Sequence, residues 1–123
     1  SIDGGGIRGI VPAVILRRLA EKDPDFLNSF DLITGTSTGA LISIMVALGA
    51  DPREIEKLYY EESGIIFHPS DLRRRANPTK SKYTDKPKKD VIERHIGPET
   101  TFQDLKKWTL ITAFRLDGKV LHK

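Results

Sequence analysis

Residues 30–41, with the sequence FDLITGTSTGAL, determine how the rest of the chain is interpreted. A β-prone run enters a Gly-Thr-Ser-Thr-Gly turn at residues 35–39, and the turn leads into an apolar helical segment. In this strand–turn–helix order a G-x-S-x-G match indicates a nucleophilic serine, because the tight turn lifts the serine hydroxyl clear of the backbone. Gly35 and Gly39 lack a Cβ and allow strand and helix to approach closely. Ser37 is therefore predicted to be a nucleophile beside the positive end of the helix, and a turn needed only for packing is the alternative.

The composition describes a soluble globular chain of 123 residues, with 38% hydrophobic and 30% charged residues, long enough for one domain or part of one. No cysteine is present, which excludes disulfides and thiolate chemistry and fits a reducing compartment, so we expect a cytoplasmic protein. No grouping of His, Asp and Glu has metal-ligand spacing, and no cofactor is expected. The chain starts at Ser1-Ile2 and stops at Lys123 without a closing element, so we expect a domain fragment truncated at both ends.

A basic segment interrupts this composition. Residues 71–90 contain eight Lys or Arg and three Asp, whereas the whole chain has a net charge of +3. Such a segment is either a landing surface for anionic lipid or nucleic acid, or a solvated loop. Its turn-rich part, residues 69–87, is interpreted as a long basic loop.

Strands and helices are expected to alternate along the chain. Apolar residues at Val11, Val14, Ile15 and Leu19 are spaced for one face of a helix, with Arg17, Arg18, Glu21 and Lys22 largely on the other side. The remaining expected elements are a strand at 30–34, a helix at 38–48, a helix from Pro52 to 63–64, a short apolar segment at 65–67, a helix at 88–96, a capped turn at 101–105, a strand at 108–114 and a hairpin turn at 117–118.

This alternation predicts an α/β fold with a mainly parallel sheet and helices on both faces. The helix at 38–48 is apolar all round, which is typical of a helix that runs through the middle of a fold. The loops after the first two strands then emerge at the same sheet edge, where α/β active sites form.

A second glycine-rich loop occupies residues 3–9, DGGGIRG, between a strand stub and a helix. It matches G-x-G-x-x-G, but the acidic residue that a dinucleotide site needs at the end of the second strand is missing, and no P-loop lysine follows. Successive glycine N–H groups at a helix N-terminus also form an oxyanion hole, which is the preferred interpretation. Arg8 would add positive charge or anchor this loop.

The two motifs together, DGGGIRG at 3–9 and GTSTG at 35–39, resemble the patatin-like phospholipase family, close to its bacterial and calcium-independent phospholipase A2 branches. The resemblance is strong over residues 1–60 and looser through 101–114. It implies Rossmann-like layering and a lipid acyl hydrolase with a Ser–Asp dyad and no metal. By this resemblance Ser37 is the nucleophile, and the oxyanion hole is formed by Gly4, Gly5, Gly6 and Arg8.

The general base is the missing part. The family's Asp-Gly-Gly or Asp-Gly-Ala motif does not occur, and the catalytic Asp is expected beyond Lys123. Asp117-Gly118 comes too early along the chain and is better explained as a hairpin turn. A histidine base is the alternative, but His95 is expected on the apolar side of its helix, His68 borders the basic loop, and a Ser37–Asp117–His122 triad is cramped.

The sequence thus predicts a serine-dependent hydrolase acting on phospholipids or related lipids, with possible contact to a membrane surface and no nucleic-acid partner. Two alternatives remain: a nucleotide- or phosphate-binding module that uses the glycine loop, and an inactive patatin-like interaction domain.

Overall fold

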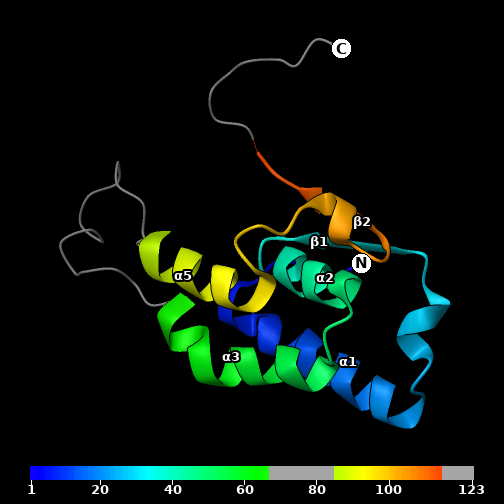
Figure 1. Ribbon diagram of the computed structural model, residues 1–123. Coiled ribbons are helices and arrows are strands. Elements are labelled where there is room, and N and C mark those ends of the chain that lie inside the picture. Colours follow the sequence, from blue (N-terminus) through cyan, green and yellow to red (C-terminus); the bar gives the residue numbers. More distant parts are fainter. Residues whose placement is uncertain (67–84, 115–123) are drawn as a thin grey trace.

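The computed structural model describes residues 1–66 and 85–114 (Figure 1). Most of the expected basic loop, the expected hairpin at 117–118, and His68 and His122 lie outside these ranges. The elements, in order, are η1 (Gly6–Gly9), α1 (Ile10–Lys22), η2 (Phe26–Ser29), β1 (Leu32–Thr36), α2 (Thr38–Leu48), α3 (Pro52–Ile66), α5 (Asp85–Ile96), η3 (Phe102–Asp104) and β2 (Trp108–Thr112).

The sheet is parallel, as the alternating pattern predicts. β1 and β2 pair in parallel with Leu32 opposite Trp108 and Thr36 opposite Thr112. Ile2 pairs with the other side of β1: its N–H donates to the Thr34 carbonyl at 2.9 Å, and its carbonyl accepts from Thr36 N–H at 3.2 Å. β1 is therefore central, and the strand stub at the N-terminus is confirmed as part of the α/β sheet.

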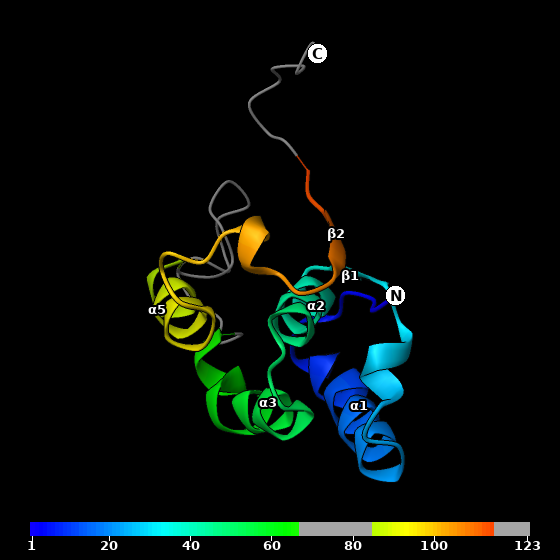
Figure 2. The ribbon, with the colours of Figure 1, turned by 45° about the vertical axis from the view of Figure 1, so that its right-hand side comes forward.

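Helix α2 forms the centre of the fold. It lies against one face of the sheet, and α1, α3 and α5 lie on its other side (Figures 1 and 2). Because it is enclosed by both layers, nearly all of its residues are buried, and Ile42 and Ala47 are completely so. The prediction that this apolar helix runs through the middle of the fold is confirmed.

Local signals in the sequence set the boundary between α2 and α3. Gly49 ends α2 in the left-handed region, with φ 89°, a conformation that glycine adopts without strain. The Asp51 carboxylate accepts from Arg53 N–H at 2.8 Å, and Pro52 is the first residue of α3. The capped turn is likewise confirmed, since the side chains of Thr101 and Asp104 form a capping box.

Four boundaries differ from the prediction. β2 ends at Thr112, two residues before the expected end of that strand. β1 lies two residues later than expected, because pairing with Ile2 and β2 keeps Gly35 and Thr36 in the sheet. α3 continues through Gly64 to Ile66, since burial of Ile66 outweighs the weak helix propensity of one glycine. α5 begins at Asp85, so the last residues of the expected basic loop are helical and Pro87 falls in the first turn, where proline is tolerated.

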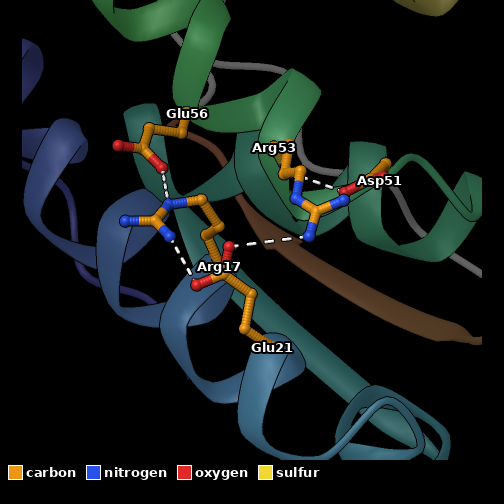
Figure 3. A network of polar contacts seen from close by, with 5 residues as sticks. All are labelled: Arg17, Glu21, Asp51, Arg53 and Glu56. Atoms are coloured by element: carbon orange, nitrogen blue, oxygen red, sulfur yellow. Dashed lines mark hydrogen bonds and ion pairs between the residues drawn. The ribbon is translucent and has the colours of Figure 1, made fainter.

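Helix α1 uses a different face from the one its apolar pattern indicates. Val11, Ile15 and Leu19 are exposed, and the buried residue is Ala13. Arg17, which the pattern assigns to the polar side, instead joins α1 to α3 (Figure 3). Its guanidinium contacts the carboxylates of Glu21, at 2.6 Å, and Glu56, and these hydrogen bonds raise the pKa of Arg17.

The outer face of the sheet carries apolar side chains. Leu32, Leu110 and Trp108 are exposed, whereas the alternate residue Ile33 is buried toward α2. The helices of the described ranges therefore lie over one sheet face, and helices on the second face are not among the described residues. No helix in these ranges is long and apolar enough to cross a bilayer.

An ion-pair cluster joins α3 to α5. The Glu62 carboxylate contacts His95 Nε2 at 2.9 Å and Arg94 Nη1 at 3.0 Å. The hydrogen bond from His95, followed by the charge of Arg94, lowers the pKa of Glu62. His95, the candidate base, is therefore an exposed residue that pairs with Glu62 on another helix, and the prediction that it lies on an apolar face is wrong.

Loss of packing around α2 is expected to destabilise the fold strongly. Ile42→Ala should lower the free energy of unfolding by about 3 kcal/mol, because it leaves a cavity in a completely buried site. Ile15→Ala is the matched control: Ile15 is 51% exposed, and its truncation should cost less than about 1 kcal/mol. Urea denaturation followed by circular dichroism measures both, and equal losses would contradict the central position of α2.

The Glu62 cluster predicts a pH-dependent contribution to stability. Because its pKa is lowered on folding, this contribution is present above the ordinary carboxyl pKa of 4.5 and is lost as the pH falls through the lowered value. Near neutral pH, Glu62→Gln should be less stable than the parent protein by about 1 kcal/mol, and the difference should vanish in strong acid. The control is Glu61→Gln, an exposed neighbour. Urea denaturation at several pH values is the measurement, and a pH-independent difference would refute the prediction.

Candidate active site

Ser37 occupies a sharp turn between β1 and α2. Its φ and ψ are 54° and −119°, and it is the one non-glycine residue with positive φ among the described residues. Such a conformation costs about 1–3 kcal/mol and persists where the surrounding structure enforces it. The side chain is exposed and makes no capping hydrogen bond to α2. The hydroxyl is thus presented to solvent at the carboxyl end of the central strand, as the elbow prediction requires.

Close backbone packing explains the two glycines of the elbow. A Cβ on Gly35 would clash with the carbonyl of Gly39, and a Cβ on Gly39 would clash with the carbonyl of Ile2. Strand β1, the start of α2 and the N-terminal strand stub therefore meet with backbone against backbone. This packing brings the glycine loop, which follows Ile2 directly, to the same sheet edge as Ser37.

The glycine loop lies against the serine turn. A Cβ on Gly4 would be 3.1 Å from the Thr36 carbonyl oxygen and 3.2 Å from Ser37 Cβ. The N–H groups of Gly4 and Gly5 have no acceptor within the described part of the chain. Gly6, with φ 60°, turns the loop into η1. The structure therefore brings together Ser37 and a set of open amide donors.

Arg8 is exposed beside this loop. Its N–H donates to the Gly5 carbonyl at 3.2 Å, and a Cβ on Gly5 would lie 3.5 Å from Arg8 Cβ and 3.7 Å from its Nε. The backbone of Arg8 thus stabilises the loop, while its side chain supplies positive charge next to the open amides.

A hollow adjoins the glycine loop, and a larger one lies away from the candidate site. An open cleft of about 380 Å³ follows the glycine loop and the start of α1, and its lining includes Gly4, Gly5, Arg8 and Ile15. A larger hollow of about 700 Å³ lies at the opposite end of the strands, because its lining residues, such as Phe30 and Trp108, precede or begin β1 and β2. The smaller cleft is therefore the one next to the candidate site.

No side chain within residues 1–66 and 85–114 is hydrogen-bonded to the Ser37 hydroxyl. His95 is engaged with Glu62 between α3 and α5. Asp117, His68 and His122 lie outside the described residues. The same ranges contain no cluster of His, Asp and Glu that could hold a metal ion.

Two polar contacts at the site are missed by sequence reasoning. Thr36 and Thr112 share a hydrogen bond of 2.6 Å between their hydroxyls, beside the turn. Thr38, directly after Ser37, is hydrogen-bonded to the buried hydroxyl of Tyr59 on α3. The spacing of Ile55, Leu58 and Tyr59 indicates that Tyr59 is on the buried face of its helix, but it carries no signal for the partner of the tyrosine hydroxyl.

These features define the class of protein: an α/β protein with a strained serine turn and a glycine-rich loop at one edge of a parallel sheet. Residues 1–118 match the patatin-like phospholipase family. The chain belongs to this family.

Individual relatives agree with this assignment. The chain is 37% identical to a cGAMP-activated phospholipase of Escherichia coli (strain TW11681), over 98% of the chain and 37% of the relative. It is 32% identical to a cGAMP-activated phospholipase of Vibrio cholerae, over 94% of the chain and 37% of the relative. It is 35% identical to patatin-17 of Solanum cardiophyllum, over 93% of the chain and 32% of the relative. The chain thus spans about a third of the length of these relatives. No solved structure matches it.

Because the backbone of Ser37 is strained, glycine at position 37 should give a more stable protein than alanine, which is the opposite of their order inside a helix. Ser37→Gly should unfold with a free energy about 1 kcal/mol higher than Ser37→Ala, because relief of strain at positive φ exceeds the entropy that glycine adds to the unfolded chain. At Ser63, inside α3, the order should reverse, with glycine less stable by about 1 kcal/mol. Urea denaturation of the four variants is the measurement, and the same order at both sites would argue against the strained elbow.

Proposed function

We propose that this chain carries the nucleophile and the oxyanion hole of a lipid acyl hydrolase that cleaves fatty-acyl esters of phospholipids or related lipids. The observation that carries the proposal is the position of the exposed, strained Ser37 against the open amides of the glycine loop. Membership of the patatin-like phospholipase family supports the same reaction class.

In the proposed reaction, Ser37 Oγ attacks the acyl carbonyl carbon while a general base takes the hydroxyl proton. The N–H groups of Gly4, Gly5 and Gly6 stabilise the negative charge that develops on the carbonyl oxygen, and Arg8 adds positive charge beside them. The ester C–O bond then breaks, and the alcohol leaves with the proton held by the base. Water attacks the resulting acyl-serine by the same route and releases the fatty acid.

The base is proposed to be an Asp that lies beyond Lys123, as the family resemblance implies. This assignment is compatible with the absence of a Ser37 partner among the described residues and with a chain that spans about a third of its relatives. The Ser–Asp dyad, rather than a histidine triad, is therefore the proposed catalytic pair. We also propose a cytoplasmic location with peripheral contact to membranes, on the basis of the cysteine-free composition and the basic segment at 71–90.

Labelling with a fluorophosphonate probe, which reacts with activated serines, tests the proposal. We compare the 123-residue chain, a protein extended beyond Lys123 in the natural sequence, and Ser37→Ala in both. The extended protein should react, and its reaction should disappear with Ser37→Ala, because the probe needs both the nucleophile and its base. The short chain should react at least about a hundredfold more slowly.

The other outcomes separate the alternatives. Equal reaction of the short chain would locate the base within residues 1–123 and overturn the proposed position of the Asp. A folded extended protein that does not react would overturn the nucleophile assignment, and saturable nucleotide binding by that protein would favour a nucleotide-binding module. Ser43→Ala, which changes a serine buried in α2, is the matched control and should leave the labelling unchanged.

A further inference from the structure

The residue that follows the candidate nucleophile is held from a separate helix. Tyr59 on α3 donates its hydroxyl proton to the backbone carbonyl of Thr38 at 3.1 Å. Its oxygen is also hydrogen-bonded to Thr38 Oγ1, and because the tyrosine proton is already used, the threonine hydroxyl is the donor. Both side chains are buried, with exposed fractions of 1% for Tyr59 and 4% for Thr38. The start of α2 is therefore fixed through its side chain and its main chain by one phenol group.

The glycine loop meets the same pair. A Cβ on Gly9 would clash with Thr38 Oγ1 and would lie 2.6 Å from Tyr59 Cε1. The φ of Gly9 is −55°, which any residue adopts, so glycine is needed here for space. Gly9 ends η1, the turn into which Gly4, Gly5 and Gly6 lead. Thr38 and Tyr59 thus pack against Gly9, where the glycine loop ends, and Thr38 is also the residue that directly follows Ser37.

We propose that Tyr59 is a positioning residue for the acyl-transfer reaction: through Thr38 and Gly9 it sets the distance and orientation between Ser37 and the oxyanion donors. This inference rests on the proposed function. Amide donors stabilise an oxyanion when they lie about 2.7–3.1 Å from it, and a displacement of about 1 Å can reduce the rate about a hundredfold. The turn at Ser37 is strained, so a surrounding structure must hold it, and Tyr59 supplies a buried anchor one residue away.

The environment of Tyr59 fits positioning and not proton transfer. Burial raises the pKa of its hydroxyl, while the hydrogen bond with Thr38 opposes this shift. The phenol therefore keeps its proton across the physiological pH range and stays a donor. Since it is buried behind Thr38 and Gly9, it acts on the reacting atoms through those residues.

The test is Tyr59→Phe in the protein extended beyond Lys123. We expect kcat for a fatty-acyl ester to fall about tenfold, the KM to change less than about twofold, and the rate constant of fluorophosphonate labelling at Ser37 to fall about tenfold. Tyr60→Phe is the matched control, because the neighbouring Tyr60 is 69% exposed on the same helix, and it should leave all three values unchanged.

A double variant separates positioning from stability. Tyr59→Phe combined with Thr38→Val removes both hydroxyls, so that no buried threonine hydroxyl is left without its partner, and part of the stability that the single change loses is restored. The Thr38 carbonyl lacks its Tyr59 donor in both variants. We expect kcat to stay about tenfold low while the melting temperature recovers in part. Recovery of kcat together with stability, or a folded Tyr59→Phe variant with unchanged kcat, would overturn the proposal. If the parent protein shows no Ser37-dependent labelling, the proposed function fails first, and this inference fails with it.

Discussion

Backbone contact without intervening side chains is the constraint on which the site depends. The Ile2 carbonyl leaves no space for a side chain on Gly39, and the Gly39 carbonyl leaves none on Gly35. The N-terminal strand stub, β1 and the start of α2 therefore lie so close together that no side chain fits between them at these positions. Because the glycine loop continues from the stub and Ser37 continues from β1, the same packing brings the proposed donors and the proposed nucleophile together.

Burial of helix α2 offsets the strain of the turn at Ser37. Ser37 adopts a conformation that local energetics disfavour, and Thr38 begins a helix that is buried on nearly every side. Displacing the turn would disturb the packing of Ile42 and Met45 deeper in the core, so the core opposes relaxation of the turn. The hydrogen bonds between Tyr59 and Thr38 also join the start of α2 to α3, so movement of the turn would disturb that helix as well. The strain at the serine is therefore balanced by hydrophobic burial elsewhere in the same helix.

The features that sequence reasoning predicts are those set by local chemistry. The turn at 35–39, the all-apolar helix after it, and the Asp51–Pro52 start of α3 follow from short-range rules. The packed face of α1 does not, since Ala13 and Arg17 contact their neighbours there while Val11 and Ile15 are exposed. The aliphatic part of an arginine side chain can pack between two helices when its guanidinium has a carboxylate partner there. A hydrophobic pattern places such an arginine on the exposed side of the helix. The pairing of Tyr59 with Thr38 is equally invisible, because residues 21 positions apart show no common spacing.

The glycine spacing that resembles a dinucleotide fingerprint has a separate physical reason at each position. Gly4 allows the loop to pass beside Thr36 and Ser37, Gly6 takes a positive φ, and Gly9 leaves room for Thr38 and Tyr59. A nucleotide-binding loop uses the same three properties: close approach, a tight turn and close helix packing. The glycine spacing therefore indicates a loop that passes close to another group at a helix N-terminus. The residues around the loop indicate which ligand that group binds. Here the neighbour is an exposed serine in a strained turn, and this is why an acyl oxyanion, rather than a pyrophosphate, is the anion proposed for this loop.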